Sequence, residues 1–233
     1  MSVKIRIKFA KYGAMKFIGH LDMMRFFQKA IRRADIDIRY SEGFSPHQIM
    51  SFASPLGVGI ESSGEYMDIE VLSMTSTEDM KQALNRVMVE GVEVLSVNIL
   101  PDNAKNAMAS IAAASYRLKM KEGDFPIIDL NGQLQRFYGQ KQIPYTKETK
   151  KSVVEMDVKQ GLYEIKADED GSIRMLVNAS SSGNIKPTMV FEKFCEFVDV
   201  EIPTSAYQVT RLETYTDLAK EGEKHQFVPL ASA

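Results

Sequence analysis

The chain has 233 residues, of which 44% are hydrophobic and 26% charged, and its formal net charge is −2. This composition is typical of a globular protein with enough apolar residues for a core, and it excludes fibrous and disordered classes. Its single cysteine, Cys195, excludes an internal disulfide and a cysteine-rich metal site. Since the sequence has neither a signal-peptide pattern nor a run of 18 apolar residues, we expect a cytoplasmic protein that does not engage the membrane.

Charge is distributed unevenly along the chain. Residues 1–50 contain ten Lys/Arg and four Asp/Glu, whereas residues 61–102 contain two Lys/Arg and nine Asp/Glu. Such asymmetry indicates either a polyanion-binding face opposite an acidic face or a solvated basic helix packed near an acidic hairpin.

The first part of the chain alternates between strand and helix periodicity. Alternating apolar residues predict strands, and apolar residues three or four apart predict helices. The elements follow in the order strand 3–9, helix 20–34, strand 49–53, strand 65–72, helix 77–89 and strand 92–100. This βαββαβ order predicts a ferredoxin-like lobe over residues 1–101.

A similar order of elements follows an alanine-rich linker at 102–114. Residues 115–216 are predicted to form a second ferredoxin-like lobe with an extra strand, and residues 217–233 a flexible tail. The fold class expected from the sequence is therefore α+β, with two tandem ferredoxin-like lobes built on antiparallel sheets.

The most informative segment is the basic helix and the Gly/Ser/Pro-rich loop after it. Basic side chains fall mostly away from the apolar stripe of the helix, and two aromatic residues occupy the loop, a pattern typical of phosphate contacts combined with base stacking. The predicted nucleic-acid-binding residues are Arg25, Lys29, Arg32, Arg33, Arg39, Tyr40 and Phe44. The predicted anion-binding loop residues are Ser41, Gly43, Ser45 and, in a second polar loop, Asn184.

Three residues are candidates for acid–base catalysis: His20, Asp22 and His47. A histidine is a suitable general base near neutral pH, and a carboxylate can orient it. The three histidines of the chain do not have metal-ligand spacing, so we expect no metal and no cofactor.

The segments 17–22, 30–34, 40–47 and 51–56 read FIGHLD, AIRRA, YSEGFSPH and SFASPL. Together with the later segment 182–187, SGNIKP, they resemble the radical-SAM-linked bacterial protein family, over roughly residues 1–217. Members usually have Ser where Gly19 stands.

This resemblance implies a partner radical S-adenosylmethionine protein. It implies no catalytic residues, because the family is itself of unknown function. This chain lacks the cysteine motif that holds the radical-SAM cluster.

The leading hypothesis from the sequence is a companion of a radical-SAM enzyme that binds RNA or presents a substrate and has no chemistry of its own. One alternative is an RNA-processing or RNA-modifying enzyme with a histidine general base. Another is a protein–protein adaptor that docks through the acidic segment 61–102.

Overall fold

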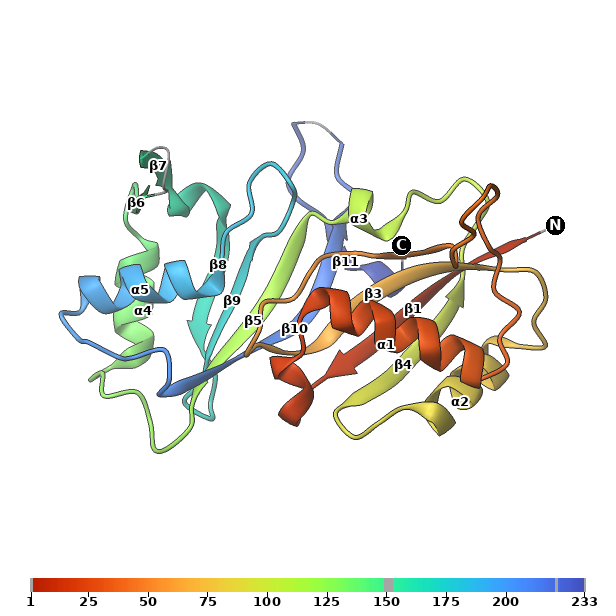
Figure 1. The fold of residues 1–233 in the computed structure, drawn as a ribbon. Coiled ribbons are helices and arrows are strands. Elements are labelled where there is room, and N and C mark those ends of the chain that lie inside the picture. The colour runs from red at the N-terminus through yellow and green to blue at the C-terminus, as the bar shows by residue number, and fades with distance from the viewer. Residues whose placement is uncertain (1, 149–152, 221, 233) are drawn as a thin grey trace. The chain divides into compact units, whose positions relative to one another are not determined.

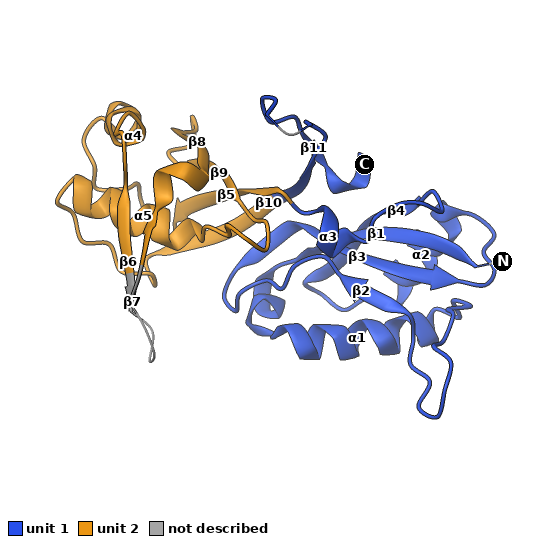
Figure 2. Cartoon of the chain, turned by 90° about the horizontal axis from the view of Figure 1, so that it is seen from above, with its two compact units in different colours: residues 1–111, 213–233 blue, residues 112–212 orange. Residues whose placement is uncertain are grey.

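A computed structural model describes residues 2–148, 153–220 and 222–232, and the chain divides into two compact units. Unit 1 consists of residues 1–111 and 213–233, and unit 2 of residues 112–212, coloured separately in Figure 2. Unit 2 is thus a continuous stretch of chain inserted into unit 1. The sequence-based boundaries, 1–101 and 115–216, differ from this division because residues near the C-terminus return to unit 1.

Unit 1 contains three well-formed strands, two long helices and several short elements (Figure 1). Its elements are β1 (Val3–Lys11), η1 (Gly13–Phe17), α1 (His20–Arg33), β2 (Met50–Phe52), β3 (Glu61–Val71), α2 (Thr77–Val87), β4 (Val92–Ile99), α3 (Ala107–Ser110), β11 (Phe227–Pro229) and η3 (Leu230–Ser232). Antiparallel pairing places β4 beside β1, β1 beside β3 and β2 beside β3. Residues 213–217 are the second half of β10 (Tyr207–Asp217), which pairs with β11.

The main core of unit 1 lies between this sheet and its two long helices. Ile5, Ile7 and Phe9 alternate along β1 toward the helices and are all buried. Phe27 of α1 contacts the ring of Phe9 edge-on, with centroids 4.7 Å apart. The apolar alternation of β1 and the apolar stripe of α1 therefore meet as their periodicities predict.

The opposite face of β1 carries Arg6 and Lys8, and both pair with acidic residues of unit 1. Arg6 is only 2% exposed, and its guanidinium forms two hydrogen bonds with Asp68 of β3, at 2.8 and 3.0 Å. Lys8 pairs with Glu213. The β1–β3 register places acidic residues opposite basic ones, so much of the charge asymmetry of the sequence is neutralised inside unit 1.

The C-terminal segment covers this second face, although we expected a flexible tail. Leu230 is fully buried in a small cluster with Ala53, Tyr66 and Ala107, and its carbonyl oxygen accepts a hydrogen bond of 3.2 Å from Arg6. The buried arginine and the apolar contact together order the end of the chain.

Unit 2 contains a sheet with two longer helices and a separate two-stranded hairpin. Its elements are β5 (Ala113–Met120), α4 (Leu130–Tyr138), β6 (Pro144–Glu148), β7 (Val153–Asp157), η2 (Val158–Gly161), β8 (Leu162–Ala167), β9 (Ile173–Asn178), α5 (Pro187–Phe197) and the first half of β10. The strand order is β10-β5-β9-β8. Phe137 of α4 and Phe194 of α5, both buried, contact each other with ring centroids 5.5 Å apart.

In the described residues, hydrogen bonds connect nine strands in the order β4-β1-β3-β10-β5-β9-β8, with β2 on β3 and β11 on β10. Strand β10 is shared by the two units because the unit boundary falls between Leu212 and Glu213. These strands and their helices confirm the α+β class. Within the described part of the chain, every helix is too short or too polar to cross a membrane.

Candidate nucleic-acid interface

Helix α1 separates its apolar and basic residues onto different faces. Met23, Phe27, Ala30 and Ile31 are buried against the sheet. The first turn carries Asp22 and the last turn carries two arginines. Charges of these signs at these ends interact favourably with the helix dipole. The helix is therefore stabilised by one face while the other remains in solvent.

A strip of basic side chains runs along the solvent face of α1. Arg25, Lys29 and Arg32 are four and three residues apart and are all exposed, as is Arg33 at the end of the helix. Arg25 pairs with Asp22 at 3.2 Å, but both side chains are about two-thirds exposed. The Nε of Arg32 donates to the carbonyl of Gln28 at 3.2 Å. Such surface contacts are weak enough for a phosphate to replace.

The loop after α1 is a narrow hairpin that extends from unit 1 (Figure 2). Tyr40 and Gln48 form an isolated antiparallel bridge, and the backbone N–H of Ser41 donates to the carbonyl of His47 at 2.8 Å. Gly43, at φ +108°, allows the tight reversal. Phe44 stands at the tip, and its side chain is fully exposed.

Two glutamines join this hairpin to the basic helix, and neither is among the predicted site residues. The side-chain amide of Gln48, which is 5% exposed, donates to the carbonyl of Gln28 at 3.2 Å. Its Oε1 is buried without a partner among the described atoms. Gln28 lies between Arg25 and Lys29, so the hairpin base is fixed beside the basic strip. A glutamine in a polar loop has no sequence signature for this role.

One nitrogen of the Arg39 guanidinium is engaged within unit 1. Its Nη1 donates to Glu70 at 2.9 Å and to the hydroxyl of Ser2 at 3.2 Å. Glu70 is itself mostly buried. This pair ties the hairpin to β3, and the phosphate contact of Arg39 stays a prediction.

The predicted anion-binding loop is largely occupied by its own hydrogen bonds. The Ser41 hydroxyl accepts from the backbone N–H of His47 at 3.1 Å and is also hydrogen-bonded to the ring Nδ1 of that histidine at 2.8 Å. Ser45 is exposed near the tip. Asn184 is exposed in unit 2 and therefore belongs to a different compact unit.

The three catalytic candidates do not form a connected group. Asp22 contacts Arg25, and His47 contacts Ser41. The ring of His20 meets the ring of Phe52 edge-on, with centroids 5.4 Å apart. His20 begins α1, whereas the His47 segment meets the helix two turns later at Gln28. No shared hydrogen bond among these described residues supports an acid–base pair.

The start of α1 is anchored by a buried lysine. Lys11, only 3% exposed, donates from Nζ to the carbonyl of Ile18 at 2.6 Å, just before the helix begins. Burial lowers the pKa of Lys11, and the nearby Glu65 carboxylate opposes that shift. This contact positions the helix. Across the described residues, no group of three or more His, Cys, Asp or Glu is arranged to hold a metal ion.

The chain is an α+β protein with an exposed basic helix and a helix-anchored aromatic hairpin. A family model described as an uncharacterized protein conserved in bacteria, DUF2344, matches residues 4–187. The protein belongs to this bacterial family.

A search of curated proteins finds no match. Among solved structures, the chain is similar to one titled an unknown protein from Galdieria sulphuraria. The sequence identity is 10%, the coverage is 85% of this chain and 91% of that chain, and the TM-score is 0.27.

Proposed function

We propose that this protein is an RNA-binding or substrate-presenting companion of a radical-SAM protein, without chemistry of its own. The observation that carries the RNA-binding part is the exposed strip of Arg25, Lys29 and Arg32 beside a hairpin that holds Phe44 in solvent. Cations on a helix face attract phosphates, and an exposed ring stacks on unpaired bases. The radical-SAM partner rests on the sequence resemblance.

The preferred ligand is single-stranded RNA. A duplex hides its base faces, whereas an unpaired strand offers them to an exposed aromatic ring. The hairpin is anchored at its base by Gln48 and Ser41, so the Phe44 ring is presented without a large ordering cost.

We also infer that each unit is a ferredoxin-like lobe. The supporting observation is the strand order, β4-β1-β3-β2 in unit 1 and β10-β5-β9-β8 in unit 2, with a helix between the first and second and between the third and fourth sheet strands of each. In unit 2 the β6–β7 hairpin is then an insertion. This likeness does not fix function.

The test is RNA binding measured by fluorescence anisotropy over a salt series. The triple variant Arg25→Gln, Lys29→Gln, Arg32→Gln should bind a labelled single-stranded RNA more weakly, and its salt slope should be shallower by about 2 for three lost contacts to a single strand. The matched control replaces three exposed lysines elsewhere, Lys141, Lys186 and Lys224, by Gln. Equal weakening by both triples, or no affinity of the intact protein at low salt, contradicts the proposal.

Phe44→Ala tests the stacking contact separately. Removing one stacked ring should weaken binding by about 1–3 kcal/mol and leave the salt slope unchanged. His20→Ala and His47→Ala should leave RNA intact and bound as before. Loss of an RNA-cleaving or RNA-modifying turnover in either histidine variant would instead establish the enzyme alternative.

A further inference from the structure

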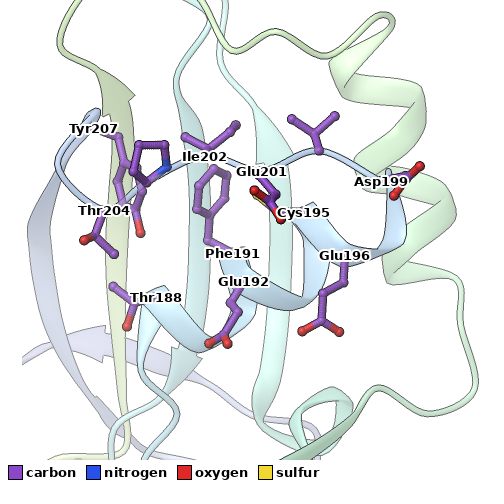
Figure 3. A pocket seen from close by; sticks show the side chains of 12 residues that line it. Thr188, Phe191, Glu192, Cys195, Glu196, Asp199, Glu201, Ile202, Thr204 and Tyr207 are labelled. Carbon is purple, nitrogen blue, oxygen red and sulfur yellow. The ribbon is translucent and has the colours of Figure 1, made fainter.

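A groove of about 960 Å³ lies in unit 2 between α5 and the segment that leads into β10 (Figure 3). One wall comes from α5, and the other comes from the segment 199–207. Twelve residues line it: Thr188, Phe191, Glu192, Cys195, Glu196, Asp199, Val200, Glu201, Ile202, Pro203, Thr204 and Tyr207. The groove lies within one compact unit and shares no residue with the basic helix.

The floor of the groove is apolar. Phe191 and Tyr207 are buried and contact each other with ring centroids 4.8 Å apart. Ile202 and Pro203 extend this surface on the other wall. Burial raises the pKa of Cys195 to about 11, so its thiol stays neutral and contributes to the floor as a small apolar group.

The rim of the groove is acidic. Glu192, Glu196, Asp199 and Glu201 are exposed, and none of the twelve lining residues is basic. Lys193, outside the lining, pairs with Glu196 at 2.7 Å. The hydroxyl of Tyr145 donates a hydrogen bond to Glu192 at 3.5 Å. Burial, followed by Glu192, raises the pKa of Tyr145, which is consistent with a negative field at this end.

We infer that this groove binds an amphipathic segment of a partner protein that carries lysine or arginine beside apolar side chains. The apolar side chains would cover Ile202 and Pro203 above the floor of the groove, and the cations would meet the rim carboxylates. A nucleic acid is disfavoured because the rim repels phosphates. The groove therefore adds a protein-docking surface in unit 2, independent of RNA binding by unit 1.

The test uses the intact protein and a fluorescein-labelled synthetic helix of leucine and lysine. The leucine–lysine helix should bind about tenfold more tightly than a leucine–glutamate helix of the same length and pattern, and added salt should weaken its binding. The variant Glu192→Lys, Glu201→Lys should lose about tenfold in affinity. Glu169→Lys, an exposed carboxylate of unit 2 outside the groove, is the matched control and should bind as the unaltered chain does.

If the charge-reversed protein folds poorly, the variant Glu192→Gln, Glu201→Gln replaces it, with circular dichroism as the check. Peptide affinity unchanged by both groove variants overturns the inference.

Sedimentation velocity distinguishes a second copy of this chain as the occupant. A monomer at the concentrations used supports a foreign partner. A dimer that the groove variants dissociate overturns the inference of a foreign partner. The groove variants should bind RNA as the unaltered protein does. The proposal of RNA binding and the proposal of partner docking can therefore be contradicted independently.

Discussion

Arg6 and Asp68 form the buried ion pair on which the second face of unit 1 depends. The guanidinium also donates to the carbonyls of Leu230 and Lys105, at 3.2 and 3.1 Å, and the carboxylate accepts from the backbone N–H of Ala107 at 2.7 Å. One pair therefore connects β1, β3, α3 and the C-terminal segment. Sequence alone could not identify it, since Arg6 occupies the outward position of an alternating strand.

Asp68→Ala should lower the free energy of unfolding by about 3–5 kcal/mol, because it leaves a buried guanidinium without a counter-charge. Urea denaturation measures this loss. Asp22→Ala removes the exposed pair with Arg25 and should cost no more than about 1 kcal/mol. The double variant Arg6→Met, Asp68→Leu should be more stable than Asp68→Ala. Equal losses in the two single variants would mean that the buried charge is solvated.

Tyr66 makes stability sensitive to alkaline pH. Burial, and next a hydrogen bond of 2.7 Å from its hydroxyl to Glu213, raise its pKa above the ordinary value. The unfolded chain releases this proton above about pH 10 while the folded chain keeps it. Protonated Tyr66 therefore contributes fully to the free energy of unfolding below about pH 10. Above that pH the contribution falls by about 1.4 kcal/mol per pH unit.

Tyr66→Phe should therefore show a shallower fall in unfolding free energy between pH 10 and higher pH, as measured by urea titrations at each pH. The exposed Tyr12→Phe controls for the loss of a hydroxyl elsewhere in unit 1. Parallel curves for the unaltered protein and Tyr66→Phe would show that Tyr66 ionises in the folded state.

Among the elements, helices with long apolar stripes agree best with their prediction. The sequence predicts a helix at 20–34, and α1 spans His20–Arg33, because its stripe and end charges act within the helix itself. Strand β2, Met50–Phe52, is shorter than the strand predicted at 49–53. Short strands depend on partners far away in the chain, which periodicity does not reveal.

In the predicted interface, too, periodicity reveals exposed positions but not contacts between distant parts of the chain. The exposed positions of Arg25, Lys29 and Arg32 follow from helix geometry alone. The engagement of Arg39 by Glu70 could not be foreseen, because it requires the three-dimensional approach of the hairpin to β3.

The C-terminal segment, expected to be a flexible tail, contributes to stability as an element of unit 1. Leu230→Ala should cost about 2–5 kcal/mol of unfolding free energy, since the side chain is fully buried. Leu218→Ala, the same substitution at a half-exposed site of that segment, should cost about 0.5 kcal/mol or less. Urea denaturation compares the two. Similar small effects would show that the segment detaches readily.

At the scale of the whole molecule, the two compact units should respond to core substitutions separately. Phe27 is fully buried in unit 1 and Phe194 in unit 2. Phe27→Ala should increase amide hydrogen exchange mainly in residues 1–111 and 213–233, and Phe194→Ala mainly in residues 112–212, since each core is local. Exchange followed by mass spectrometry checks this. Uniform acceleration of both units by either variant would indicate a single cooperative core.

The division of unit 1 into two parts of the chain has a consequence for synthesis. On the ribosome, all of unit 2 emerges before residues 213–233. These residues supply the second half of β10, strand β11 and the turn whose Leu230 carbonyl accepts a hydrogen bond from Arg6. The unit begun first is therefore completed last. A nascent chain halted near residue 212 would carry an incomplete N-terminal unit with an uncovered face, a target for chaperones and proteases.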